Sequence, residues 1–266
     1  MSFKTEVQNI LGDATAADTS HVAHAMVTAT NAEKVVEDAL WDLANLLPPQ
    51  LLLSTAEEQE IDDDEFLLEK ETRVLLVQRK DTVSISPVLF YSCKEIPYNQ
   101  YTKYIDPSSI YLATNLDPIW YKTGNSSDAT QKYGKINIYP ETGTISKFWR
   151  YEKAVVSKCA SGTTVDDPSA SVHDIWFWDG ADNEAAVEGE TTYYNYAIPH
   201  FFPAEAHLAL KLLIATRLAN QYLVEFAINE EDSEVSNLVK SAIEVIDAEF
   251  KIQMNRLGAN KEKETA

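Results

Sequence analysis

Apolar residues recur at intervals of three and four along the C-terminal part of the chain, and this spacing predicts helices. Residues at such intervals share one stripe of a helix. The first stripe consists of Leu208, Leu212, Ala215, Ala219, Tyr222 and Phe226. Pro203 suits the first turn, because its missing N–H would have no helical partner there. We therefore expect a helix that begins near Pro203 and ends before the polar residues 229–233.

A second apolar stripe follows this polar break and predicts a helix that ends at Gly258. Its members are Val235, Leu238, Val239, Ala242, Ile246, Phe250 and Leu257. Asp232 or Ser233 is suited to cap its start, because either side chain accepts a hydrogen bond from a first-turn N–H. The apolar face is broad enough to pack on more than one neighbour. Residues 200–258 thus form a helical hairpin that needs a cover, and residues 259–266 are expected to be a disordered tail.

Residues 1–50 show the same helical period and are candidates for that cover. Phe3, Val7, Ile10 and Leu11 share a face of a short first helix, which Gly12 is expected to stop. A second helix is expected from Thr19 or Ser20 to the pair Pro48-Pro49, which cannot continue a helix. Its stripe consists of Val22, Met26, Ala29, Ala32, Val36, Leu40, Leu43 and Leu47. We expect the N-terminal helices and the C-terminal hairpin to form one helical bundle.

Residues 71–199 change to the shorter apolar runs of strands, separated by segments rich in Pro, Gly, Asn and Asp. The pattern predicts strands near 73–77, 83–85, 109–114, 119–123, 135–139, 146–155, 172–178 and 191–196. Such short strands are typical of an antiparallel sheet or a small barrel. Because this β-rich region lies between helices that pack together, the sequence predicts an α+β fold with an inserted β domain.

Residues 51–70 contain a nearly continuous acidic run from Glu57 to Glu65. A run of like charges repels itself, so we expect a solvated linker here. A calcium loop is the alternative, but it requires regularly spaced oxygen ligands and a turn glycine, which this run lacks. The whole chain carries a net charge of -20, which opposes binding to nucleic-acid phosphates. We therefore expect no sequence-specific contact with DNA or RNA.

Few residue patterns indicate chemistry. His21 and His24 lie three residues apart on a predicted helix, but two ligands do not make a zinc site, and a polar helix face is the simpler interpretation. The 8 glycines form no phosphate-binding loop, and no nucleophile elbow is present. Cys93 and Cys159 lack a metal-ligand spacing, and buried thiols are favoured over a disulfide. We expect no cofactor, no metal site and no enzymatic activity.

The run Trp176-Phe177-Trp178 is the most aromatic part of the chain. On a strand, Trp176 and Trp178 face one side and Phe177 the other, so one large aromatic surface is difficult to bury in a small sheet. Either the strand is central and covered on both faces, or one face meets another chain. Tyr194, on a strand expected to pair with it, raises the same question. We take Trp176, Trp178 and Tyr194 as candidate interface residues.

The middle of the chain contains five segments in order, and these occupy residues 73–79, 93–97, 106–114, 117–121 and 135–140. Together with the helical ends, their order resembles the head-to-tail connector, adaptor and neck proteins of tailed bacteriophages. The resemblance covers most of the chain, but the 160–172 linker and the Trp-rich hairpin depart from the pattern. It implies a helical bundle with a β insertion and a ring of copies between portal and tail.

This resemblance implies a structural role in a phage virion, in the neck or tail region, after synthesis in the host cytoplasm. The expected partners are identical copies in a ring, the portal protein, and neck or tail proteins. DNA would pass through the ring without sequence-specific binding, and no membrane contact is expected. Two alternatives remain open: a soluble monomeric binding module, and a hydrolase that uses some of the 42 acidic residues.

Overall fold

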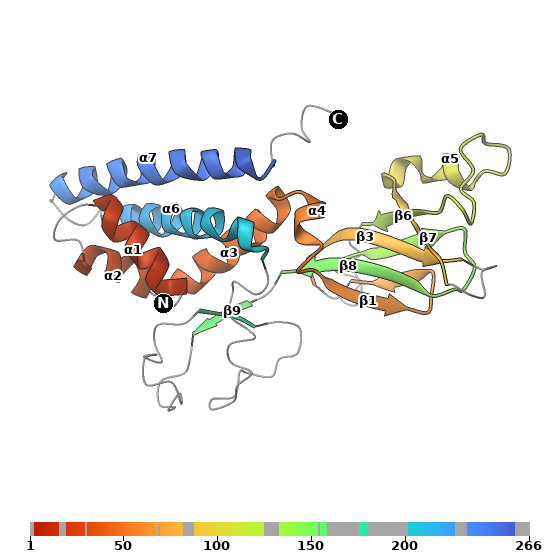
Figure 1. Cartoon of the computed structure of the whole chain (residues 1–266), viewed down its shortest axis with the longest axis horizontal. Helices are drawn as coiled ribbons and strands as arrows, with labels where there is room; N and C mark the ends of the chain where they lie inside the picture. Colours follow the sequence, from red (N-terminus) through yellow and green to blue (C-terminus); the bar gives the residue numbers. More distant parts are fainter. Residues whose placement is uncertain are drawn as a thin grey trace. The chain divides into compact units, whose positions relative to one another are not determined.

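The protein is described from a computed structural model of the 266-residue chain. The described residues are 3–15, 20–29, 31–68, 70–81, 88–124, 133–153, 155–158, 176–179, 202–226 and 233–258. The chain divides into two compact units, one formed by residues 1–55 and 154–266 and the other by residues 56–153. We call them the helical unit and the β unit. Helices dominate the first and sheets the second, which makes the fold α+β (Figure 1).

The helical unit combines helices from both parts of the chain. Its described elements are α1 (Phe3–Thr15), α2 (Ser20–Thr28), α3 (Ala32–Leu46), α4 (Pro49–Leu52), β9 (Val155–Lys158), β10 (Trp176–Asp179), the short 3₁₀ helix η5 (Ala204–Ala206), α6 (His207–Phe226) and α7 (Ser233–Arg256). The N-terminal helices α1 and α3 pack on α6, and α1 also packs on α7. The expected bundle of N-terminal and C-terminal helices is therefore confirmed.

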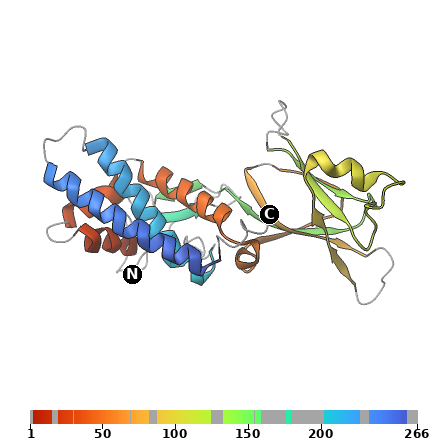
Figure 2. The same cartoon turned by 90° about the horizontal axis from the view of Figure 1, so that it is seen from above.

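Helix α6 is the centre of the helical unit. It packs against α1, α2, α3 and α7. Leu210, Ile214, Leu218 and Ala219 are buried along its length, and most of their neighbours are buried too. A helix that is apolar on nearly all sides has to be enclosed by others. Helix α7 runs beside it, as Figures 1 and 2 show in dark blue next to light blue. Among its described side chains, those on one face are buried and those on another are exposed.

Two details of the N-terminal helices differ from the sequence prediction. The expected single helix from residue 20 to residue 47 is wrong, because it is interrupted between α2 and α3. There the Ala32 N–H donates to the Ala29 carbonyl at 3.0 Å, in a turn. Thr28 and Asn31 are residue types of low helix propensity, and such residues favour breaks. Gly12 does not stop α1, whereas Gly258, with a φ of +78°, does follow the end of α7 as predicted.

The described residues of the β unit form two four-stranded sheets. The first has the order β1-β8-β3-β4, and the second has the order β2-β7-β6-β5. Their strands are β1 (Glu57–Ile61), β2 (Glu65–Leu67), β3 (Thr72–Lys80), β4 (Phe90–Ser92), β5 (Lys94–Glu95), β6 (Ile119–Thr123), β7 (Lys135–Tyr139) and β8 (Ser146–Glu152). All neighbours are antiparallel except β5 and β6. The unit also holds η1 (Tyr98–Gln100) and α5 (Tyr101–Ile105).

The two sheets share one hydrophobic core. Val77 of β3 and Phe148 of β8 come from the first sheet, and Trp120 and Ile138 come from the second. Alternate residues of a strand face the same side, so each sheet contributes one apolar face to this core. The strands at 119–123 and 135–139 are confirmed as β6 and β7. The described strands form open sheets, so the barrel that was one of the two expected forms is not what they adopt.

The acidic linker predicted at residues 51–70 is wrong. This segment contains the end of α4 and the strands β1 and β2, and β1 pairs with β8. The Lys147 ammonium lies 2.7 Å from a Glu58 carboxylate oxygen, and the Arg150 guanidinium lies 3.3 Å from that of Glu57. These basic side chains offset the repulsion within the acidic run, because opposite charges across strands attract. A sequence-local charge count cannot detect partners about 90 residues away.

The predicted limits of the β-rich insertion also change. Residues 56–153 form the β unit, whereas β9 and β10 belong to the helical unit. The strand expected at 109–114 is wrong: the Asp106 carboxylate accepts the Ser108 N–H at 2.8 Å and starts a turn instead. The strands expected at 83–85 and 191–196 and the tail at 259–266 lie outside the described residues.

Candidate functional site

Two of the three interface residues predicted from the sequence lie on the strand β10. Trp176 and Trp178 belong to β10, which pairs with β9 so that Trp176 lies opposite Lys158 and Trp178 opposite Val156. Only the backbone of this hairpin is described, and Tyr194 lies outside the described residues. Their role in an interface stays a prediction.

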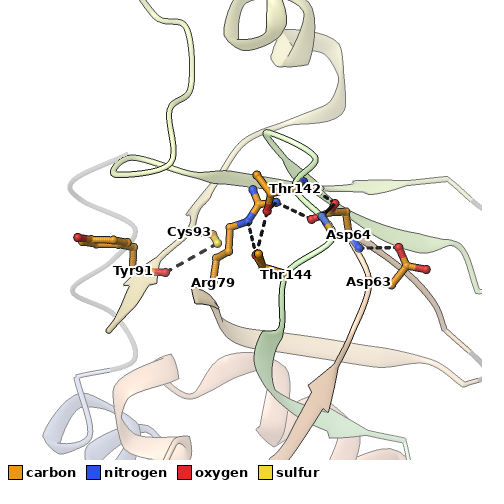
Figure 3. Close-up of polar contacts among 8 residues, drawn as sticks. Asp63, Asp64, Arg79, Tyr91, Cys93, Thr142 and Thr144 are labelled. Carbon is orange, nitrogen blue, oxygen red and sulfur yellow. Dashed lines mark hydrogen bonds and ion pairs between the residues drawn. The ribbon is translucent and has the colours of Figure 1, made fainter. Parts of the chain in front are cut away.

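The most enclosed polar cluster lies in the β unit and joins three distant parts of the chain (Figure 3). Arg79, near the end of β3, is 1% exposed. Its Nη2 lies 2.5 Å from Oδ1 of Asp64, which is in the bend between β1 and β2. The other oxygen of Asp64 accepts the backbone N–H groups of Thr142 and Gly143, each at 2.7 Å. The carboxylate therefore binds a strand and a turn at once.

The environment of this cluster indicates a structural role. Burial lowers the pKa of the Arg79 guanidinium, and the Asp64 charge opposes that shift. Both carboxylate oxygens of Asp64 accept hydrogen bonds from the protein, and the residue is buried, so its charge is used within the fold. Thr142 and Thr144 supply further oxygens to the guanidinium. Asp64 fixes the connection between β7 and β8, and no local sequence pattern indicates this pairing.

Cys93 lies close to the same cluster and does not provide a reactive nucleophile. Burial raises the pKa of its thiol to about 12, and the nearby Arg79 charge offsets only part of that rise. The thiolate is the reactive form of cysteine, so a buried thiol with this pKa is unreactive near neutral pH. Cys93 is free of any disulfide, as the sequence suggested; Cys159 lies outside the described residues.

A second group of side chains lies around α5, and several of them are exposed. We call residues 98–116 of the β unit the α5 segment. Tyr98, Tyr101 and Tyr121 form a stack in which the ring centroids of successive pairs are 5.1 and 5.2 Å apart. The same segment exposes Ile110, at 91%, and Leu116, at 70%. Tyr98 and Tyr111 are more than half exposed as well. Rigid aromatic groups beside exposed aliphatic ones are typical of surfaces that bind proteins.

A third group lies on the outer face of α7. Leu238, Val245 and Ile252 are exposed and follow one another at intervals of seven residues. The side chains that α7 buries against the rest of the helical unit are different ones, namely Val239, Ala242, Ile246 and Met254. The sequence pattern predicted an apolar face broad enough for more than one neighbour. In the structure one part of that face is buried within the helical unit and the other part is exposed.

Within the described residues, no three His, Cys, Asp or Glu side chains are grouped so that they could hold a metal ion. The acidic run 57–65 instead makes ion pairs with Lys135, Lys147 and Arg150. No helix in the described part of the chain has the length and apolar character needed to cross a membrane. The surfaces on the α5 segment and on α7 are thus the candidate functional features of these residues.

Comparisons with protein-family models, with curated proteins and with solved structures gave no significant match. The resemblance to phage connector proteins therefore remains an expectation from the sequence.

Proposed function

We propose that this protein is a structural component of a tailed-phage virion, a connector, adaptor or neck protein that assembles as a ring between portal and tail. In this role the protein acts through contacts with identical copies and with its portal and tail neighbours, and it carries out no reaction. The proposal combines the sequence resemblance with the surface of the α5 segment, which is the observation that carries it.

The α5 segment supports this function because it presents apolar groups that the β unit does not cover. Ile110 and Leu116 extend from the turns after α5, while Tyr101 and Tyr104 pack against the small core formed by Ile96, Ala113 and Ile119. The packed rings of Tyr101 and Tyr104 thus hold the exposed surface of the α5 segment in place. A ring subunit needs a heterologous contact in which one patch meets a different patch of the next copy. The α5 segment, with exposed apolar side chains on a packed base, is suited to such a contact.

The charge of the protein also supports a place along a DNA channel. A net charge of -20 repels phosphate groups, so DNA is expected to slide past such a protein without adhering. Part of this charge is offset locally, since Glu57, Glu58 and Glu65 make ion pairs with basic side chains. The excess carboxylates remain elsewhere on the chain. We expect no measurable binding to duplex DNA even at low salt, as a gel-shift titration would measure.

The proposal is tested by measuring the mass of the purified protein alone and after mixing it with the portal protein of the same virus, with particle imaging of the mixture. We expect a closed ring of many copies, at least in the presence of the portal. Ile110→Asp should prevent ring formation, because it places a charge in the apolar contact. Val88→Asp, an exposed change outside the α5 segment of the same unit, is the matched control and should leave the ring intact.

A protein that forms no ring with or without the portal, and that is absent from purified virions, would contradict the proposal. A monomer that binds one other protein through the α5 segment would instead support the binding-module alternative, since the same exposed groups suit that role. If Ile110→Asp and Val88→Asp both leave a ring unchanged, the ring exists but the α5 segment does not form it.

A further inference from the structure

Helix α7 carries two apolar faces, and only one is used within the chain. Viewed down the helix, the buried residues Val239, Ala242 and Ile246 lie on the side that packs on α6 and α1. Leu238, Val245 and Ile252 lie well to one side of them, and all three are exposed. A spacing of seven residues keeps successive side chains on nearly the same line of a helix. The second face is therefore a continuous stripe.

The residues between these three complete the pattern of a coiled-coil seam. Each large residue is followed three positions later by a small or polar one, namely Ser241, Ala248 and Asn255. All of these positions are exposed. In heptad notation the large residues occupy the a positions and the others the d positions. We call these six positions the α7 seam. A seam with large side chains at a and small ones at d fits best against a partner that places large opposite small.

We propose that the α7 seam binds the α7 seam of a second copy of this chain, with the two helices antiparallel. In an antiparallel pair, the a positions of one helix face the d positions of the other. Val245 then lies opposite Ala248 of the second copy, Ile252 opposite Ser241, and Leu238 opposite Asn255. Every layer combines a large side chain with a smaller one, so the helices can approach closely.

The charges beside the seam favour the antiparallel orientation over the parallel one. Glu244 and Lys251 occupy the flanking g positions, and Glu249 and Arg256 the e positions. An antiparallel pair brings Glu244 of each copy next to Lys251 of the other, which is attractive twice. A parallel pair in register brings Glu244 next to Glu249 and Lys251 next to Arg256, which is repulsive in every case. The sequence thus opposes the parallel pair.

The contacts that Lys251 makes within its own helix do not prevent this pairing. Its ammonium lies 2.6 Å from an Asp247 carboxylate oxygen, one turn earlier, and the Lys251 side chain is largely exposed. Exposed ion pairs of this kind contribute little, so Lys251 can turn to Glu244 of the second copy at small cost. Because Glu244 is also exposed, pairing does not require any buried group to move.

An antiparallel pair is two-fold symmetric, and it uses the α7 seam of both copies, so no α7 seam is left for a third copy. It therefore cannot extend into a ring by itself, and the ring proposed above has to use other surfaces, such as the α5 segment. The α7 pair goes beyond the proposed function and does not depend on it. It concerns the protein in solution without any portal.

The pair is tested by sedimentation equilibrium of the full-length protein across the micromolar concentration range. We expect a reversible monomer–dimer equilibrium. Val245→Glu should raise the dimer dissociation constant by at least about tenfold, because it places charges in the apolar layers. Val224→Glu is the matched control: Val224 is 65% exposed on α6 and Val245 is 64% exposed on α7. Both variants should melt like the original protein, and only the first should lose the dimer.

The orientation is tested by reversing single charges. Glu244→Lys should weaken an antiparallel dimer about two- to fivefold, because it places two lysines together, and the double change Glu244→Lys with Lys251→Glu should restore it. In a parallel dimer the same single change would instead strengthen association, because the introduced lysine would meet Glu249 of the second copy. Strengthening would overturn the antiparallel arrangement. A protein that stays monomeric throughout, or a dimer that Val245→Glu does not affect, would overturn the α7 pair itself.

Discussion

Different interactions stabilise the interiors of the helical unit and of the β unit. Among the described residues, Lys4 is the only buried polar or charged side chain of the helical unit, and α6 is enclosed by aliphatic neighbours. The β unit buries Asp64, Arg79, Asn137 and Arg150 in addition to its apolar core. Apolar burial requires only suitable size and pattern, whereas a buried charge requires one particular partner. The helical unit should therefore tolerate conservative changes better than the β unit.

The largest effect is expected from Asp64→Ala. This change leaves the buried Arg79 guanidinium without its counter-charge and leaves the Thr142 and Gly143 N–H groups without an acceptor. Loss of one partner of a buried pair costs about 3–5 kcal/mol. Urea unfolding measures the loss, and hydrogen exchange should show faster exchange in residues 140–145.

Asp63→Ala is the control for this change. Its carboxylate accepts a single hydrogen bond, from the Asp64 N–H at 2.6 Å, and Asp63 is exposed. Removal of one such bond costs about 0.5–1.5 kcal/mol. If both variants lose the same stability, the buried cluster does not organise the β unit in the way described.

In the helical unit the largest effect is expected from a cavity at the first turn of α6, which comprises His207–Phe226. Leu210 is fully buried, and Leu210→Ala should cost about 2–5 kcal/mol, since the neighbouring helices cannot close the space completely. Leu208, two residues earlier on the same helix, is 42% exposed, and Leu208→Ala should cost less than about 1 kcal/mol. Thermal unfolding of both variants measures the difference. Equal losses would mean that α6 is not enclosed as described.

Within the β unit, removal of a packed charged side chain should lower the free energy of unfolding more than removal of a more exposed one. Arg150 makes ion pairs with Glu57 and Glu152 and lies over the rings of Phe66 and Phe148. Arg150→Ala removes both kinds of contact and should cost about 1.5–3 kcal/mol. The pair of Lys135 and Glu65 is more exposed and should contribute only about 0.2–1 kcal/mol, so Lys135→Ala is the comparison. High salt should reduce the second loss more than the first.

The smallest effect near neutral pH is expected from Cys93. Its thiol has a pKa of about 12 in the folded protein against an ordinary value of 9.0, because burial disfavours the thiolate. A raised pKa means that the neutral thiol's contribution to stability is complete below pH 9 and is lost as the pH rises toward 12. With Cys159 changed to Ser, iodoacetamide at about pH 8 should modify Cys93 slowly in the folded protein and quickly in urea. Rapid modification of the folded protein would contradict its burial.

The same difference between the units explains what the sequence could predict. Apolar intervals along α6 and α7 report directly on packing, so the hairpin, its end at Gly258 and the covering N-terminal helices followed from pattern alone. The strands β6 and β7 also followed from short apolar runs between turn residues. These features depend on neighbours in the sequence.

Features that depend on distant partners were missed. The acidic residues 57–65 form strands because Lys147 and Arg150 lie opposite, and Asp64 is buried because Arg79 and the turn at Thr142 meet it. Nothing in the local sequence indicates either partner. The α5 segment was misread for a different and local reason: its turns depend on side-chain hydrogen bonds, such as that from the Ser108 N–H to the Asp106 carboxylate, which a pattern of apolar residues does not reveal.

The insertion of the β unit into the helical unit has a consequence for biogenesis. Residues 56–153 are contiguous and leave the ribosome together, whereas α1 to α3 pack on α6, which is translated only after them. Domains tend to fold as soon as their chain is complete. The β unit should thus fold first. The helices α1 to α3 should stay without their packing partner, or bound to chaperones, until translation has passed Phe226.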